Sequence, residues 1–296
     1  MWINDITVFS YSVDYAYVTY TMSRSDYLPS SLTGELAALK DLGPVLLGLV
    51  PRSPVIVNAG MDHVMMSGMA AKAVLDVACW DILGKAMQLP TATLLGGRLA
   101  DDLPAFSVIG VGDPITGVEK ARGELEKGLT AMQLKVGDDP LRRVKAIREA
   151  MPDSIELWAD ANGGRNLDQA LRFCRALGQD ITVALEQPCR LLSDCGEVGQ
   201  HTGLPIALDE SIVTMADLVA AYVAGITGVN IKVSRVGGFT KARVLRDAAV
   251  ALDMMVTIDD TGGCCFQSRP EALVSEAICT FHLLYVALPE PGLFIS

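Results

Sequence analysis

The chain has 296 residues, of which half are apolar and a fifth are charged, and its 24 basic and 35 acidic side chains give a formal net charge of -11. This length allows one large domain or two smaller ones with a sizeable core. Nucleic acids and anionic membranes are bound mainly through clustered Lys and Arg, so the acidic balance argues against both as partners.

The opening residues and the cysteines bear on the cellular compartment of the protein. Asn4 and Asp5 interrupt the start of the chain, so we expect no secretion signal, and the apolar runs are too short to span a membrane. The seven cysteines are an odd number, and Cys189 and Cys195 have no second pair at zinc-like spacing. We therefore expect a reduced, cytoplasmic setting.

In chain order, the first strongly periodic segments are helical. Residues 32–49 and 70–87 carry apolar side chains every three or four positions, which predicts two amphipathic helices. Trp80 lies on the apolar stripe of the second helix, and we interpret it as a core residue.

From Leu103 onward, short apolar segments alternate with helical stretches of ten to fifteen residues. The apolar segments are LPAFSVIG near 103, AMQLKVG near 131, IELWADANGG near 155, ITVALEQP near 181, LPIALDES near 204, GVNIKVSRVGG near 228 and MMVTIDDTGG near 254. Their polar ends recur every 23 to 27 residues, the length of one βα unit. Consecutive βα units predict an α/β fold with a parallel sheet closing as a TIM-like (β/α) barrel. A doubly wound open sheet is disfavoured, because no G-x-G-x-x-G follows the first strand.

Ionisable side chains stand at the ends of these predicted strands, where the active site of a parallel barrel lies. They are Lys135, Asp160, Glu186, Asp209 with its neighbour Glu210, Lys232 and Asp259. Carboxylates on three adjacent strands would repel one another unless a cation lay between them. Oxygen ligands with open positions suit Mg²⁺, so Asp160, Glu186 and Asp209 are the predicted ligands.

The two lysines flank the predicted metal site, one before the first carboxylate and one after the third. A metal on a substrate carboxylate stabilises the enediolate that forms when the α-proton leaves. A desolvated lysine near such a cation favours its neutral form, which a general base needs. Lys135 and Lys232 are therefore the predicted proton-transfer groups.

Simpler explanations exist for each of these residues taken alone. A single acid at a strand end often caps the next helix, and strand-end lysines are usually solvated. The ordered set over five consecutive units favours the functional interpretation. Gly237 and Gly238 have two open explanations, an anion cradle at a helix N-terminus or a tight βα turn.

The ordered motifs QLKVG, DAN, LEQP, LDES, IKVSRVGG and DDTGG, with KAVLDVACWDILGKAMQLPTATLLGG at 72–97, resemble the mandelate racemase and muconate lactonizing enzyme branch of the enolase superfamily. The resemblance runs from about Met61 to Gly263 and is strongest to cis-3-hydroxyproline dehydratase and proline-betaine epimerase types. It implies a capping α+β domain at 1–100 and a barrel domain at 101–296, with the metal and acid/base roles given above. Further substrate or supporting residues would be Gln133, Asn162, Glu210, Asp259, Asp260 and Thr261.

Three departures from the family pattern change the expectation. Gln133 replaces the first lysine of the usual K-x-K pair. Thr261 is followed directly by Gly262, without the usual tryptophan. The missing aromatic ring disfavours a cationic betaine substrate, which such a ring would bind by cation–π attraction. Only 31 residues precede the first predicted helix at 32–49, and the pattern fades after Gly263, so we expect a reduced cap and a barrel incomplete at the eighth unit.

The sequence therefore predicts Mg²⁺-dependent removal of the proton α to a carboxylate, leading to epimerisation, racemisation or dehydration of a small amino acid or hydroxyproline-like acid. Dipeptide epimerisation and sugar-acid dehydration are alternatives within the class. The alternative from another class is a non-catalytic barrel that acts as a binding protein. We expect a homo-oligomer with a small-molecule carboxylate substrate.

Overall fold

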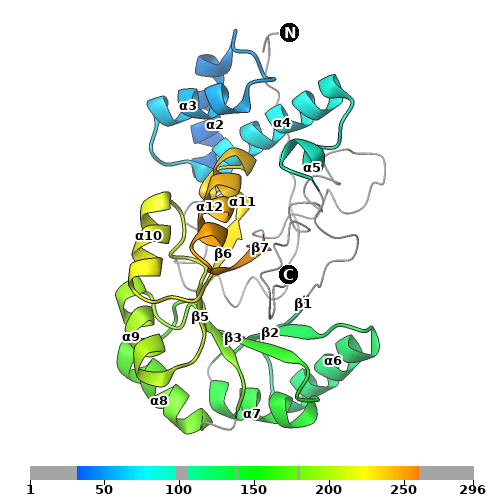
Figure 1. Cartoon of the computed structure of the whole chain (residues 1–296), viewed down its shortest axis with the longest axis vertical. Coiled ribbons are helices and arrows are strands. Elements are labelled where there is room, and N and C mark those ends of the chain that lie inside the picture. Colours follow the sequence, from blue (N-terminus) through cyan, green and yellow to red (C-terminus); the bar gives the residue numbers. More distant parts are fainter. Residues whose placement is uncertain (1–31, 98–105, 138, 179–180, 260–296) are drawn as a thin grey trace. The chain divides into compact units, whose positions relative to one another are not determined.

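The computed structural model describes residues 32–97, 106–137, 139–178 and 181–259 (Figure 1). Its strands are β1 (Phe106–Ile109), β2 (Ala131–Lys135), β3 (Glu156–Asp160), β4 (Ala184–Glu186), β5 (Ile206–Leu208), β6 (Gly228–Lys232) and β7 (Met255–Asp259). Its helices are α2 (Leu32–Leu46), α3 (Pro54–Val64), α4 (Met69–Met87), α5 (Thr91–Leu94), α6 (Pro114–Glu126), α7 (Pro140–Ala150), α8 (Leu167–Leu177), α9 (Leu192–Thr202), α10 (Met215–Val223), α11 (Val233–Val236) and α12 (Phe239–Ala251).

The strands lie in one sheet in their sequence order, from β1 to β7. The pairings recorded from β1 through β6 are all parallel, as right-handed βα crossovers require. Each predicted apolar segment contains one of these strands, so the predicted (β/α)-barrel fold class is confirmed. The expected reduction of the cap and incompleteness at the eighth unit concern residues 1–31 and 260–296, which lie outside the described residues, so both stay predictions.

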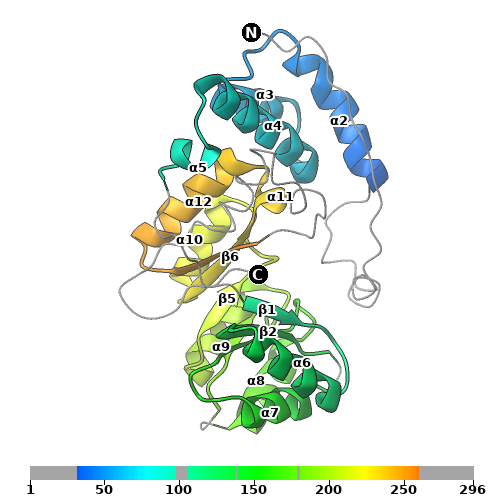
Figure 2. The same ribbon diagram turned by 90° about the vertical axis from the view of Figure 1, so that its right-hand side faces the viewer.

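The chain divides into two compact units by its internal contacts. Within the described residues, one unit comprises those from 106 to 230 and Ala248–Thr257. Helices α6, α7 and α8 lie on one side of strands β1 to β3 in both views (Figure 1, Figure 2). Strand side chains such as Leu134 and Leu185 are buried, as expected of a parallel sheet that is covered by helices.

The other unit, again within the described residues, comprises 32–97, Ile231–Asp247 and 258–259. Helices α2, α3 and α4 share an apolar core, which contains Leu42, Val57, Met61 and Leu75. Helix α11 packs on α4. The two predicted helices in 32–49 and 70–87 are confirmed as α2 and α4, whereas the predicted domain boundary at 100/101 stays a prediction. Within the described residues, no helix is both long and apolar enough to cross a bilayer.

Two helices of the barrel begin with reciprocal capping boxes, which fix where each loop ends. Asn166 accepts the backbone N–H of Gln169 at the start of α8, and Thr214 accepts that of Asp217 at the start of α10. In both helices the third residue's side chain returns a bond to the cap residue's own N–H. These caps make the connections short and well defined, and they hold the strand ends next to them.

Helices α9 and α10 approach closely at Gly196, where a Cβ atom would lie 2.9 Å from the carbonyl oxygen of Ala224. We predict that Gly196→Ala destabilises the protein by about 1–3 kcal/mol, because backbone must move to admit the methyl group. Urea denaturation, followed by its midpoint, measures the change.

Gly123 in α6 is the matched control, since a Cβ atom there meets nothing within 4 Å. Gly123→Ala should leave stability unchanged or raise it by roughly 0.4–1 kcal/mol, because alanine has less backbone entropy to lose. Equal midpoints for the two variants would show that the α9–α10 contact is not tight.

Candidate active site

The candidate site is built on the C-terminal ends of β2, β3 and β4. The parallel register pairs Lys135 with Asp160 and Asp160 with Glu186, so three charged residues stand at one level of the sheet. All three are buried, with Asp160 only 1% exposed and Lys135 9% exposed. Burying charges in this way is costly unless they are paired, so their contacts determine what the site can do.

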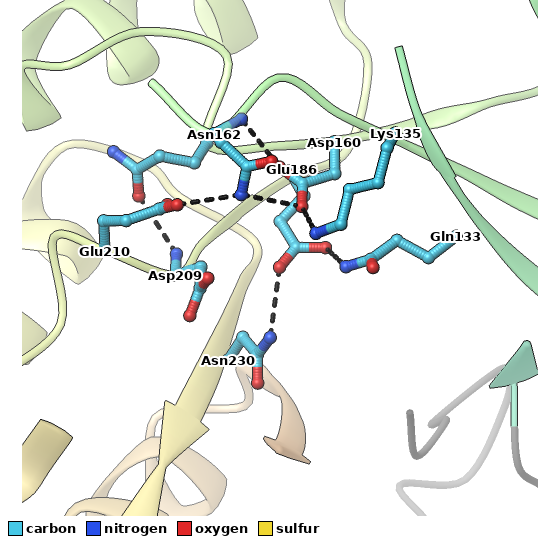
Figure 3. Close-up of polar contacts among 9 residues, drawn as sticks. Gln133, Lys135, Asp160, Asn162, Glu186, Asp209, Glu210 and Asn230 are labelled. Carbon is cyan, nitrogen blue, oxygen red and sulfur yellow. Dashed lines mark hydrogen bonds and ion pairs between the residues drawn. The ribbon is translucent and has the colours of Figure 1, made fainter. Parts of the chain in front are cut away.

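Lys135 forms an ion pair with Asp160 (Figure 3). Its Nζ atom contacts Oδ2 of the carboxylate, and the Asn162 side chain donates to the same oxygen at 3.1 Å. The backbone N–H of Asn162 donates to Oδ1 at 2.7 Å. Asn162 also donates to Glu210 Oε1 at 2.9 Å, which links β3 to the loop after β5. The Lys135 amine is thereby held at a defined place.

Glu186 lies between two amide side chains, as Figure 3 shows. Gln133 donates to Oε2, and Asn230 donates to Oε1 at 3.0 Å. Both amides are nearly inaccessible, at 3% and 1% exposure. Amide donors orient the carboxylate without adding an opposite charge beside it, which suits the predicted role of Glu186 as a metal ligand.

Asp209 follows β5 and is fully buried. Its backbone N–H donates to Oε1 of Gln187 at 3.0 Å. Gln187 in turn donates to Ser211 Oγ at 2.6 Å and to the Cys189 carbonyl at 2.9 Å. One buried amide therefore fixes the loop after β4 to the loop after β5.

Helix capping does not account for the strand-end carboxylates. The cap residues of the helices that follow are Asn166 for α8, Leu191 for α9 and Thr214 for α10, and none is a strand-end acid. The simpler explanation for Asp160, Glu186 and Asp209 is therefore wrong. Their burial at a sheet end needs another reason.

The remaining predicted residues are placed less completely. Lys232 ends β6 and is 2% exposed. It belongs to the second compact unit, so its place opposite Lys135 stays a prediction. Asp259 is the last residue of β7. Asp260 and Thr261 lie outside the described residues.

The donor set fits Mg²⁺ by its chemistry. Three buried carboxylates at neighbouring strand ends supply hard oxygen ligands, the kind that this ion prefers. Among the side chains that the structure describes, no three acidic, histidine or cysteine groups converge closely enough to hold a metal ion. Lys135 instead supplies positive charge to Asp160. Metal ligation by Asp160, Glu186 and Asp209 therefore stays a prediction.

Asn230 and Gln187 were missed by sequence reasoning. Asn230 stands two residues before Lys232, so the alternation of a strand puts both on the same face, and this signal was available. Gln187 directly follows Glu186, and alternation would aim it the other way. Its left-handed backbone, with φ of 35°, redirects the side chain, and no sequence pattern announces that conformation.

Comparisons with known proteins agree with this architecture. Residues 117–284 match the enolase C-terminal domain-like family, and residues 20–96 match the mandelate racemase/muconate lactonizing enzyme N-terminal domain. The chain is 37% identical over 81% of its length to cis-3-hydroxy-L-proline dehydratase of Roseibium aggregatum, and covers 66% of that protein. It is 31% identical over 68% of its length to N-succinyl-L-Arg/Lys racemase of Bacillus cereus, and covers 56% of that protein. The chain thus spans less than two thirds of these relatives.

Solved structures give the same picture. A mandelate racemase/muconate lactonizing enzyme from Roseovarius nubinhibens, complexed with magnesium, superposes with a TM-score of 0.77 at 32% identity, covering 81% of this chain and 67% of that one. A counterpart from Aspergillus oryzae gives 0.81 at 30% identity, with 89% and 72% covered. Strand order, strand-end residues and both domain matches agree, and the chain belongs to the mandelate racemase/muconate lactonizing enzyme family of the enolase superfamily.

Proposed function

We propose that this protein removes the proton α to the carboxylate of a small amino acid or hydroxyproline-like acid, in a Mg²⁺-dependent reaction. The observation that carries the proposal is the Lys135–Asp160 ion pair, in register with Glu186. It puts a candidate base beside two candidate metal ligands. The resemblance to a cis-3-hydroxy-L-proline dehydratase supports the substrate class.

The residues of this chain have separable tasks in the proposal. Asp160, Glu186 and Asp209 would hold Mg²⁺, which supplies positive charge to stabilise the enediolate form of the substrate. Lys135, when neutral, accepts the α-proton at Nζ. Asn162 holds the Asp160 carboxylate by two donated bonds, and Gln133 and Asn230 hold Glu186. These amides keep the acids from rotating, so the reacting groups are ordered before the substrate arrives.

The second lysine decides the outcome. If Lys232 returns a proton to the opposite face of the α-carbon, the product is the epimer. If instead the β-hydroxyl of a hydroxyproline-like acid leaves with a proton, the C–H and C–O bonds break, a Cα–Cβ double bond forms and water is released. Dehydration is the outcome that the relative from Roseibium aggregatum favours.

A second candidate within the same chemistry is dipeptide epimerisation. A hydrophobic dipeptide epimerase from Enterococcus faecalis is 31% identical over 72% of this chain, which covers 61% of that enzyme. Both candidates require the same base and metal ligands, so substrate trials must separate them.

We also propose that the protein is a homo-oligomer and that it works in a reduced, cytoplasmic setting. The buried cysteines at 79, 174, 189 and 195, which form no disulfide, agree with the reduced setting.

The first test is deuterium exchange at the α-carbon, followed by NMR in D₂O with hydroxyprolines, prolines, sugar acids and dipeptides. We expect exchange with Mg²⁺ for at least one hydroxyproline or proline, and none with EDTA. Lys135→Ala should reduce the rate by roughly 10²-fold or more, since general-base catalysis supplies about that factor. Intact protein that exchanges no compound of the panel would favour the non-catalytic binder instead.

A second test addresses the metal ligands. At a Mg²⁺ concentration about 100 times its dissociation constant, binding to the native state should add about 2.7 kcal/mol of stability. Glu186→Gln should remove most of this gain, because it neutralises one ligand. Calorimetric titration gives the affinity, and thermal denaturation gives the stabilisation.

Glu156→Gln is the matched control for the metal test. Glu156 starts β3, at the strand end away from the site, and donation from the Trp158 indole holds its carboxylate at 2.9 Å. Its substitution should leave the Mg²⁺ affinity unchanged. Equal losses in both variants would mean that the ion binds by total charge and not at the strand ends.

A further inference from the structure

A buried carboxylate in the capping part of the chain contacts the segment that carries Lys232. Asp76 lies in the middle of α4 and is fully buried. Its Oδ2 atom accepts the backbone N–H of Thr240 at 3.0 Å, and its Oδ1 atom accepts the Thr240 hydroxyl at 2.5 Å. Thr240 is the second residue of α12, so Asp76 caps a helix that begins 163 residues later in the chain, at Phe239.

Two more side chains of the same unit complete this anchor. Asn58 of α3 donates to Asp76 Oδ1 at 3.2 Å and reaches the Gly237 carbonyl at 3.4 Å. The Trp80 indole N–H donates to the Thr240 hydroxyl oxygen at 3.0 Å. Trp80 is therefore more than the core residue that its apolar stripe suggests. We call Asn58, Asp76, Trp80 and Thr240 the α12 anchor.

The turn between α11 and α12 is shaped to fit this carboxylate. Gly237 and Gly238 have φ of 90° and 111°, a region that favours glycine. A Cβ atom on Gly238 would lie 2.4 Å from Asp76 Oδ2 and 2.7 Å from its Cγ. The glycine pair is thus a tight βα turn packed on Asp76, and the anion at this helix N-terminus is the protein's own carboxylate.

Lys232 lies on the other side of that turn. It is the residue immediately before α11, a single short helix of Val233–Val236 that leads directly into the two glycines. The N–H of Gly238 donates to the Val233 carbonyl at 2.9 Å, and this backbone hydrogen bond links the start of α11 to the glycine turn. Helix α11 also packs on α4. Fixing Thr240 and the glycine turn therefore fixes where the backbone of Lys232 stands.

We propose that Asp76 is a positioning residue for Lys232: through the α12 anchor it holds the 232–240 segment, and with it the second acid/base lysine. This inference rests on the proposed function for the role of Lys232. Asp76 does not touch the reacting atoms in the proposal. Its contribution is a fixed backbone, without which a long lysine side chain reaches its target in too few of its conformations.

The test uses the proposal that the two lysines serve opposite faces of the α-carbon. Exchange in D₂O is measured for both enantiomers of the active substrate, and Lys232→Ala identifies the enantiomer whose exchange needs Lys232. We expect Asp76→Asn and Thr240→Val to slow that enantiomer by roughly 10- to 100-fold through kcat, while the Lys135-dependent enantiomer changes little. Thr240→Ser keeps the hydroxyl donor and should restore most of the rate.

Asp41→Asn, at an exposed acid on α2 of the same unit, is the matched control and should affect neither enantiomer. Equal slowing of both enantiomers by Asp76→Asn and Thr240→Val would indicate general damage and would overturn the inference. So would unchanged rates in both variants.

Hydrogen exchange of the 232–242 backbone gives a readout independent of activity. The anchor predicts faster amide exchange there in Asp76→Asn and Thr240→Val, with the β2–β4 amides unchanged and Thr240→Ser close to the original protein. Unchanged protection in 232–242 would overturn the inference even if the enzyme is active. If the original protein exchanges no substrate but the anchor variants lose this protection, the proposed function fails while the anchoring is upheld.

Discussion

The parallel register of β2, β3 and β4 is the constraint on which the site depends. It aligns Lys135, Asp160 and Glu186 at one level, and each is buried. In such a place a charge is tolerated only with partners, and removing one member of a buried ion pair typically costs about 3–5 kcal/mol. The three residues are therefore mutually dependent. A shift of one strand by one residue would turn its charged group to the other face of the sheet.

Neutral amides surround this charged row, and their chemistry explains one departure from the family pattern. Gln133 donates to Glu186 from the position where the family pattern noted in the sequence has the first lysine of a K-x-K pair. A lysine there would add a second positive charge beside Glu186, a predicted metal ligand, and would compete with the ion for it. Glutamine keeps the bond and omits the charge. Asn162 and Asn230 act in the same way on Asp160 and Glu186, so the acids are oriented while their negative charge remains available.

Much of this arrangement is predictable because a βα repeat has a nearly fixed length. The recurrence of Lys135, Asp160 and Glu186 predicts both the strands and the end at which their side chains gather. Gln187 escapes prediction because a left-handed φ redirects it. Asp76 is a different case: an acid one turn before Trp80, beside the apolar stripe of the predicted helix, is visible in the sequence. Its partner Thr240 is 164 positions away, and only the fold brings the two together.

Burial disfavours the charged form of the Asp76 carboxylate, and this cost bears on the role of the residue. Burial raises the pKa of this carboxyl from 3.8 to about 6, although Thr240 and Asn58 donate hydrogen bonds to it. Burial, together with the nearby charge of Asp76, also raises the pKa of the Cys79 thiol to about 12. Since the folded state binds the Asp76 proton more tightly than the unfolded state, the contribution of this group to stability falls as pH rises from about 4 to about 6.

The carboxylate is therefore charged near neutral pH at some cost in stability, and an apolar side chain of similar size would avoid that cost. An apolar side chain could not accept the Thr240 N–H and hydroxyl together, nor the Asn58 amide. Packing alone tolerates small rotations of a helix, whereas several directed bonds to one carboxylate do not. The charged carboxylate thus lowers the stability of the protein but fixes where α12 begins. The strand end that carries Lys232 lies eight residues before Thr240.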